Sequence, residues 1–558
     1  RTASFTGMEA EAAEIPEYMR SVTYFGDEWP INYWNSEDKN MEENMARIAA
    51  DGFNSLILVV PWREFQPSEV GSYFNERAFA RLDQVMDCAE RHGLGVVLRL
   101  GYVWDYLGAT ETPKRFAAIT KDDGPERKLW LEYSKKVYET AAAHENFWGG
   151  FITWEDFWNY TENMGRDLAM SRRIRMAKDC GYQAYLEENY TLDQVRGFYG
   201  PKLETFEQVY IPYKDHPSAE LFYEFYDHFL TELMTETQAV FPGLSLEIRA
   251  DGDIVSDGMG GTKYYSHSAT YPCPGADYAA LMYSVSMGQV NTGNKIPASE
   301  ALAAMTRNLD SIYAAAGKPL YIEQLLYMDS TEAFSHNTQV EDEQVGTFVR
   351  SLAPVLSGRT NGYGLWVYRN YVNNAVYNSQ FALDQEGWSF SGDSRIEERN
   401  GSKAAVIGKK GSISQDLDGR IPGSSRIHVE FYAEAENGGA SVTVRLGGDE
   451  QTIHVGEGKT YRMEFVSLPR YTFSITAERR IHVDDIRVYT YEQNGRIYER
   501  DGSAGDLAGA FRTLTGELTA GSVPAGGMAA GTPDAGEIPS GQQIGRTTAA
   551  EATHAADE

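Results

Sequence analysis

Eight short apolar runs alternate with helical stretches along residues 20–378, and this pattern constrains the fold more than any other feature. Several runs are almost continuously apolar, which is typical of strands that are buried on both faces of a parallel sheet. Several of the intervening helical stretches end in glycine directly before the next run, where a helix C-cap belongs. The runs are 21–26, 53–62, 93–102, 149–156, 244–253, 276–284, 319–327 and 362–370. Together they predict an α/β fold, a (β/α)8 barrel over residues 20–380.

The regions outside the barrel differ from it in composition. Residues 1–19 read as an N-terminal extension, and the start at Arg1 suggests that a signal peptide has been removed. Short alternating runs between glycine-rich turns over 384–492 predict an antiparallel β-sandwich. Residues 501–558 are mostly Ala, Gly, Thr and Ser with few large apolar side chains, so we expect a disordered tail or linker there.

Charge and motifs exclude several classes of function. A formal net charge of -31 argues against binding of nucleic acid or an anionic membrane surface. No apolar run is long enough for a transmembrane helix, so we expect no membrane insertion. The cysteines Cys88, Cys180 and Cys273 show no CxxC or Cys/His metal spacing, and we expect buried thiols. No nucleotide or metal motif is present, so we expect neither a cofactor nor a metal.

Tryptophan is concentrated where the predicted barrel would form its active site. In this fold the site lies at the C-terminal ends of the strands. Seven of the 10 tryptophans are expected at or just beyond such ends: Trp29, Trp34, Trp62, Trp104, Trp154, Trp158 and Trp366. Flat indole rings around one rim suit stacking against sugar rings. The alternative for any single tryptophan is packing within a long loop.

Two glutamates stand at the ends of the fourth and seventh predicted strands. Glu155 lies in FITWED and Glu323 in LYIEQ, each among apolar neighbours where an ionisable group is costly to bury. Strands four and seven face each other across a barrel mouth, so the two carboxylates could flank one bond. A retaining glycosidase needs such a pair about 5 Å apart. The alternatives are a salt-bridge role for either glutamate and Asp156 as the acid.

These residues resemble those of the clan A glycoside hydrolases, whose acid/base and nucleophile occupy the ends of strands four and seven. The stretches GFNSLILVVPWREFQPSEVGSYF and RHGLGVVLRLGYVWDY are similar to the second and third βα units of family 35 and family 42 β-galactosidases. The barrel as a whole also resembles family 5-like enzymes. The resemblance implies that Glu155 is the acid/base and Glu323 the nucleophile. It covers about 350 residues of the chain.

The resemblance also implies roles around the two glutamates. Arg99 would lie near the substrate, Tyr283 would hydrogen-bond the nucleophile, and Trp366 would form the floor of the first sugar subsite. One position departs from the clan pattern, because Trp154 stands where Asn usually precedes the acid/base. That departure leaves the identity of the sugar open.

Other polar residues have two interpretations each. They are Glu247, Arg249, Asp251 and Asp253 around the fifth strand, and His267 in the loop beyond it. The first four could bind sugar hydroxyls or form a polar layer inside the barrel. His267 could roof the pocket, although a solvated loop histidine is the interpretation that the sequence favours.

The β-sandwich resembles jelly-roll carbohydrate-binding modules in its opening LDQEGWSFSGDSRIEERNGSKAAVIG and its closing VDDIRVYT. Trp388 is its one tryptophan, so a binding platform would need Tyr432, Tyr461 or Tyr471. The alternative is a sandwich that only supports the barrel. For the whole chain we expect a secreted or cell-surface retaining glycosidase with a carbohydrate substrate. A non-catalytic carbohydrate-binding protein on an inactive barrel and a transglycosylase remain alternatives.

Overall fold

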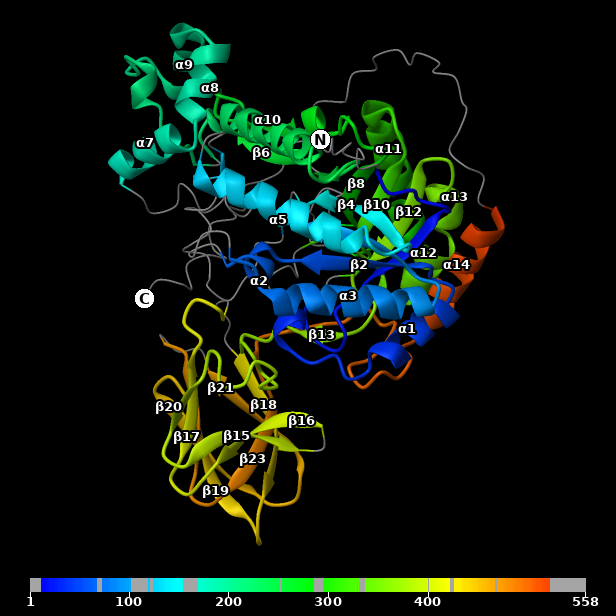
Figure 1. The fold of residues 1–558 in the computed structure, drawn as a ribbon. Coiled ribbons are helices and arrows are strands. Elements are labelled where there is room, and N and C mark those ends of the chain that lie inside the picture. The colour runs from blue at the N-terminus through cyan, green and yellow to red at the C-terminus, as the bar shows by residue number, and fades with distance from the viewer. Residues whose placement is uncertain are drawn as a thin grey trace, which may run out of the picture.

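The computed structural model consists of a barrel, a β-sandwich and a C-terminal segment that returns to the barrel (Figure 1). It describes residues 12–67, 73–101, 119–120, 124–153, 169–213, 215–250, 252–285, 295–328, 330, 337–399, 401–421, 426–466 and 470–521.

Eight parallel strands close into a barrel in the order β1-β12-β10-β8-β5-β4-β3-β2, which confirms the predicted fold. Every strand overlaps one of the predicted apolar runs. The strands are β1 (Met19–Thr23), β2 (Ser55–Val60), β3 (Gly95–Leu100), β4 (Phe147–Ile152), β5 (Ser245–Arg249), β8 (Ala279–Ser284), β10 (Leu320–Leu326) and β12 (Thr360–Leu365). Almost all of their residues are buried, because one face fills the barrel and the other supports helices.

The interior of the barrel is a packed layer at the level where the strands begin. Its members are Met19, Ile57, Val97, Trp148, Phe151, Tyr278, Ala280 and Tyr321. Their neighbours along each strand, such as Leu56, Leu98 and Leu281, point outward into the larger cluster that joins strands and helices. A shift of one residue therefore decides whether a side chain reaches the interior or the helix layer.

Helices surround the barrel because each buries one apolar stripe. In α3 the buried residues Phe79, Leu82 and Met86 recur at helical spacing. Gly317 ends α11 with a φ of 66°, a left-handed position that favours glycine. The helices are α1 (Met41–Ala50), α2 (Trp62–Phe65), α3 (Glu76–Arg91), α5 (Pro125–Ala141), α7 (Met170–Asp179), α8 (Tyr182–Asn189), α9 (Leu192–Tyr199), α10 (Ala219–Thr237), α11 (Ala298–Ala316), α12 (Val345–Arg350) and α13 (Ala353–Leu356). None of the helices in the described ranges is long and apolar enough to cross a membrane.

Two connections carry additional elements. Between β4 and β5, helices α7, α8 and α9 form a group that extends from the barrel, and α10 leads back to it (Figure 1). After β5 the chain forms a hairpin of β6 (Gly252–Ser256) and β7 (Thr262–Ser266). A short pair of β9 (Lys295–Ile296) and β11 (Gln339–Val340) follows β8 and β10.

The predicted β-sandwich is confirmed as two five-stranded antiparallel sheets. One contains β14 (Ser389–Ser391), β17 (Ser412–Asp416), β19 (Ala440–Leu446), β20 (Asp449–Val455) and β22 (Thr472–Ala477). The other contains β15 (Ser394–Arg399), β16 (Ser402–Ile407), β18 (Arg426–Ala435), β21 (Lys459–Val466) and β23 (Ile481–Tyr489). Trp388 is buried between Phe381 and Phe473 and donates its indole N–H to the carbonyl of Asn378, so it belongs to the sandwich core.

The sandwich also braces the loop that follows β1. Arg487 on β23 lies 2.6 Å from the buried carboxylate of Glu28. The side chain of Asn35 accepts a hydrogen bond from the backbone N–H of Asn378 at 3.0 Å. These buried contacts fix the first βα loop of the barrel against the sandwich.

The C-terminal stretch that we expected to be disordered from residue 501 is folded through residue 521, so that boundary is wrong. β24 (Glu492–Gln493) pairs with β13 (Tyr371–Val372), and α14 (Ala508–Gly521) packs beside α12 (Figure 1). Phe511, Leu514 and Leu518 are buried in the barrel cluster. Their spacing forms one helical stripe within an otherwise Ala- and Gly-rich segment. Residues 522–558 lie outside the described residues.

Candidate active site

Arg99 is the centre of a polar cluster in the barrel interior, near the C-terminal ends of the strands. It is 2% exposed and lies on β3. One terminal nitrogen, Nη1, donates to Gln324 Oε1 at 2.8 Å, and the other, Nη2, donates to Thr153 Oγ1 at 2.9 Å. One guanidinium therefore connects β3 with the ends of β4 and β10.

Two buried carboxylates lie around the same guanidinium. Glu247 on β5 has its Oε2 3.1 Å from Arg99 Nη2, and Glu323 on β10 has its Oε2 3.9 Å from Nη1. Their side chains are 0% and 1% exposed, respectively. Buried carboxylates need a cation and hydrogen bonds to offset the loss of water, and Arg99 provides the cation. Thr153 also connects Arg99 with Glu247, because the hydroxyl that accepts from Arg99 donates to Glu247 Oε2 at 3.4 Å.

An irregularity in β10 brings two consecutive residues to Arg99. The register of β10 shifts between Tyr321 and Gln324 against β8, and between Ile322 and Leu325 against β12. In a regular strand, neighbouring side chains point to opposite faces. At this bulge both Glu323 and Gln324 contact the interior arginine, which a strict alternation would forbid. We did not predict Gln324 or Thr153, and only their proximity to Glu323 and Glu155 in the sequence pointed to them.

Tyr283 does not take the place that the family resemblance implied. It points outward from β8 into the cluster between strands and helices, where its hydroxyl bonds Asn308 of α11. Burial raises the pKa of its phenol. The inward positions of the same strand are Ala280 and its alternating neighbours. A hydrogen bond from Tyr283 to Glu323 is therefore ruled out by the phase of the strand.

Two of the rim tryptophans pack in the core instead of facing a pocket. Trp62 is 1% exposed, lies edge-on to Trp130 at 5.3 Å, and donates its indole N–H to Gln66. Trp34 is 4% exposed and donates its indole N–H to the carbonyl of Val59. Since their rings and N–H groups are already engaged, neither presents a face to a ligand.

Trp366 and Trp29 are the described tryptophans that fit a binding rim. Both are partly exposed, and they follow β12 and β1, which are neighbours in the barrel. Tyr371 joins them: its ring is stacked on Trp29 at 6.4 Å and lies edge-on to Trp366 at 6.0 Å. The ring of the buried Phe25 lies tilted against Trp366, with the ring centroids 6.3 Å apart. Within this aromatic cluster, Trp29 and Trp366 are the partly exposed rings. They lie at the end of the barrel where the strands have their C-termini, as the polar cluster does.

Several predicted site residues lie outside the described residues. They are Trp104, Trp154, Glu155, Asp156, Trp158 and Asp251. Thr153 is the last described residue before Glu155, and its hydroxyl contacts Arg99. The backbone thus leaves β4 at the polar cluster two residues before Glu155.

His267 is buried between two carboxylates, so the solvated loop histidine that we favoured is wrong. Its Nδ1 lies 2.8 Å from both oxygens of Asp227 on α10, and its Nε2 lies 2.6 Å from Asp253 Oδ2 on β6. Burial lowers the pKa of His267, but Asp227 and Asp253 together outweigh it and raise the pKa to about 9. Asp253 is thereby occupied with holding the hairpin to α10. Arg249 is half-buried at the end of β5, where its carbonyl accepts from Tyr271.

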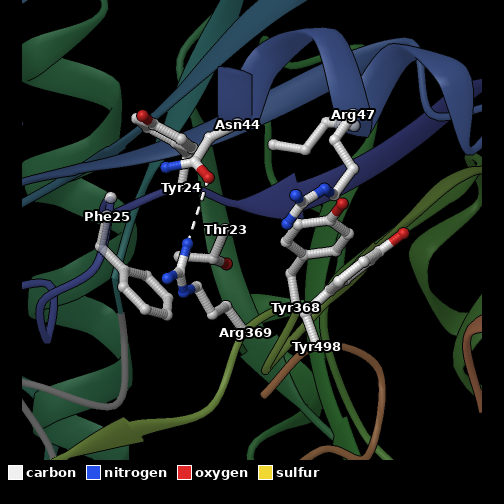
Figure 2. Close-up of a pocket in the computed structure, with 10 residues that line it drawn as sticks. Thr23, Tyr24, Phe25, Asn44, Arg47, Tyr368, Arg369 and Tyr498 are labelled. Atoms are coloured by element: carbon white, nitrogen blue, oxygen red, sulfur yellow. Dashed lines mark hydrogen bonds between the residues drawn. The ribbon is translucent and has the colours of Figure 1, made fainter. Parts of the chain in front are cut away.

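A small pocket lies elsewhere, between the end of β1, α1 and the C-terminal segment (Figure 2). Arg369 crosses it, donating to Asn44 at 3.1 Å and pairing with Asp27 at 2.6 Å. Arg47 donates to the carbonyl of Gly502 at 2.8 Å. Arg369 also donates to the carbonyl of Arg500 at 2.7 Å, so both cations join the barrel to the C-terminal segment.

Comparison with family models and with curated proteins gave no match. Among solved structures, the fold is similar to that of glycoside hydrolase family 5 enzymes. The GH5_18 protein from Bifidobacterium longum subsp. longum is 12% identical with a TM-score of 0.40, over 64% of this chain and 71% of that chain. The exo-β-1,4-mannosidase from Opitutaceae bacterium strain TAV5 is 13% identical with a TM-score of 0.39, over 66% of this chain and 56% of that chain.

A smaller likeness involves a carbohydrate-binding module of family 61, solved in complex with β-1,4-galactotriose. It is 19% identical with a TM-score of 0.18, over 21% of this chain and 99% of that chain. At these identities and TM-scores the likenesses concern the course of the backbone alone. Any inference about function depends on the residues of this chain.

Proposed function

We propose that the chain is a retaining glycoside hydrolase, with Glu323 as the nucleophile and Glu155 as the acid/base. The observation that carries the proposal is the convergence of two strand ends on Arg99. Glu323 of β10 lies 3.9 Å from that arginine, and Thr153, two residues before Glu155, hydrogen-bonds it at 2.9 Å. A retaining mechanism requires two carboxyl groups at one such point.

The described residues suit the role of Glu323. Its carboxylate is buried at the level of the barrel mouth, and the attraction of Arg99 orients it and stabilises its negative charge. Gln324 and Thr153 hold the guanidinium from two sides, so the arginine is fixed before substrate arrives. Glu247 takes the other side of the same guanidinium, as part of a polar layer that keeps Arg99 in place.

The reaction proceeds by two displacements. Glu323 attacks the anomeric carbon, while Glu155 donates its proton to the leaving oxygen and the glycosidic bond breaks. Glu155, now a carboxylate, removes a proton from water, which attacks the same carbon and releases Glu323. The product keeps the configuration of the substrate. Trp366 and Trp29 would stack on the apolar faces of the sugar rings.

The test is turnover of a panel of polysaccharides and aryl glycosides by the full chain. Glu323→Gln should abolish activity on every substrate. Glu155→Gln should still release the aglycone of aryl glycosides with good leaving groups in one burst, after which the glycosyl-enzyme accumulates because water lacks its general base. Glu478→Gln, an exposed substitution of the same kind in the sandwich, is the matched control and should be fully active. NMR of the first-formed anomer should show retention, and inversion would refute the mechanism.

Azide separates the two roles. With Glu155→Ala, azide should restore turnover and give a glycosyl azide of the substrate's configuration, because it needs no general base. With Glu323→Ala, azide should give the opposite configuration, since only one displacement occurs. Swapped results would reverse the two assignments. Sugar binding without any turnover by the unmodified chain would favour the non-catalytic alternative, and transfer to a second sugar would indicate transglycosylation.

A further inference from the structure

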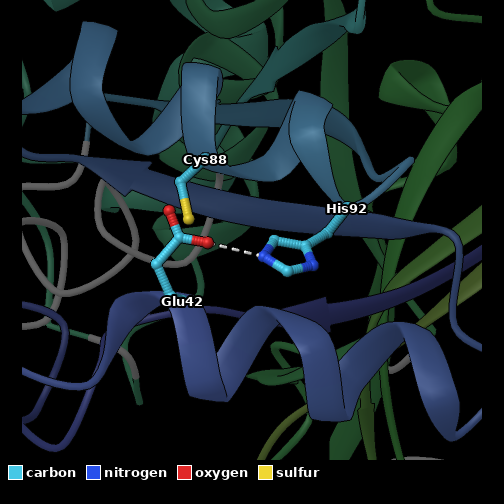
Figure 3. A group of neighbouring side chains, drawn as sticks. All are labelled: Glu42, Cys88 and His92. Carbon is cyan, nitrogen blue, oxygen red and sulfur yellow. Dashed lines mark hydrogen bonds and ion pairs between the residues drawn. The ribbon is translucent and has the colours of Figure 1, made fainter.

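Three potential metal ligands meet on the outside of the barrel, between two helices (Figure 3). Glu42 comes from α1, Cys88 from α3, and His92 is the residue directly after α3. One ligand atom of each lies within 4.8 Å of the other two, and Glu42 Oε2 is 2.7 Å from His92 Nε2. Cys88 and His92 are four residues apart, which places them on one face of a helix. The third ligand comes from another helix, so the sequence showed no metal spacing.

We propose that Glu42, Cys88 and His92 bind one Zn²⁺ ion that links α1 to α3, with water as the fourth ligand. Thiolate, imidazole and carboxylate are the side-chain ligands of zinc, and sulfur disfavours magnesium and calcium. A tetrahedral ion with bonds of about 2.0–2.3 Å holds its ligand atoms about 3.5 Å apart. The Glu42 side chain is 61% exposed, so it can turn inward to close the remaining distance.

The surroundings leave room for the ion. Cys88 is buried and forms the inner wall, while His92 is 24% exposed and opens the site to solvent. Arg91 pairs with Glu42, but its side chain is 57% exposed and can turn into water. Exchanging this exposed ion pair for a metal bond costs little, since water screens such pairs. The thiol proton leaves to solvent when the ion binds.

The position of the site defines its role. His92 ends α3 just before β3 begins, so the site lies at the end of the barrel opposite the mouth. An ion there holds two helices of the first βα units together and takes no part in the proposed hydrolysis. The inference is therefore independent of the proposed function.

A second group on the same surface serves as a comparison. Asp87, Glu90 and His144 also lie within 4.8 Å of one another, but they include no sulfur. His144 is already placed between Asp83 at 2.9 Å and Asp87 at 3.3 Å. We therefore expect zinc to prefer the group that contains Cys88.

The experiment titrates the full, metal-stripped chain with Zn²⁺ in a calorimeter. We expect one ion per chain, and His92→Gln or Glu42→Gln should weaken the affinity at least about 10-fold. His228→Gln, a substitution of a 61% exposed histidine on α10, is the matched control and should leave it unchanged. Co²⁺ in place of Zn²⁺ should show a thiolate charge-transfer band, which reports on Cys88 without replacing that buried residue.

The proposal would be overturned if the unmodified chain bound no zinc, or if His92→Gln and Glu42→Gln bound zinc as tightly as the unmodified chain. A cobalt spectrum without the thiolate band would also overturn it. Loss of binding in His144→Gln with full affinity in His92→Gln would move the site to the comparison group and refute this one.

Discussion

The buried ion pair of His267 and Asp227 makes the stability of the barrel depend on pH. The folded state raises the pKa of His267 from 6.5 to about 9. A raised pKa adds stability that is fully present below pH 6.5 and is lost as the pH rises through 9. The difference of 9 − 6.5 = 2.5 corresponds to about 3 kcal/mol, at 1.36 kcal/mol for each pH unit. Both partners are almost fully buried, so solvent screens the pair little.

The perturbation is the double substitution Asp227→Asn and His267→Gln, which removes both charges together. Denaturant unfolding of both proteins at several values between pH 6 and 10 gives the difference in unfolding free energy. That difference should be largest near pH 6 and shrink by about 3 kcal/mol by pH 10. His228→Gln, whose side chain is 61% exposed, should show no such trend. A difference that is constant over this range, or that grows with pH, would refute the assignment of a buried imidazolium.

Trp366→Ala should raise KM or lower kcat/KM with little change in melting temperature, and marked destabilisation with unchanged kinetics would assign the ring to packing. Phe511→Ala should lower the free energy of unfolding by about 3–5 kcal/mol, because the ring is buried 5.1 Å from Tyr327; a change near zero in denaturant unfolding would show that α14 is not docked. Arg487→Ala should cost about 3–5 kcal/mol by leaving Glu28 buried without its cation, and adding Glu28→Gln should recover part of that loss. No recovery in the double variant would mean that Arg487 acts through packing.

The sequence determined the barrel and the sandwich. Strands that are buried on both faces must be apolar along their whole length, so the eight runs marked the barrel strands to within a few residues. The alternating runs after residue 384 marked strands with one buried face in the same way. Burial of charge is costly, which is why Glu323 stood out within an apolar strand. Arg99 was indicated only by the family resemblance, and the structure places it 3.9 Å from Glu323.

Because the barrel strands are apolar along their whole length, the sequence does not show which face of the sheet each strand residue occupies. An apolar run has no alternation, so its phase is set only when the barrel closes; this is why Tyr283 faces α11 while Arg99 faces the interior. The bulge that turns Gln324 toward Arg99 has no residue signature. Trp62 and Trp366 follow strands alike, and only the helices packed beside Trp62 remove it from the rim.

Contacts between distant segments were decided by the tertiary structure alone. His267 meets Asp227 across 40 residues, and Phe511 of α14 reaches Tyr327 of the barrel. The sequence predicted a solvated His267 and a disordered segment around Phe511. Composition describes a segment on average and does not show which residues contact it in the folded protein. Local pattern encodes how much surface an element must bury, whereas the partner that covers this surface depends on the closure of the whole fold.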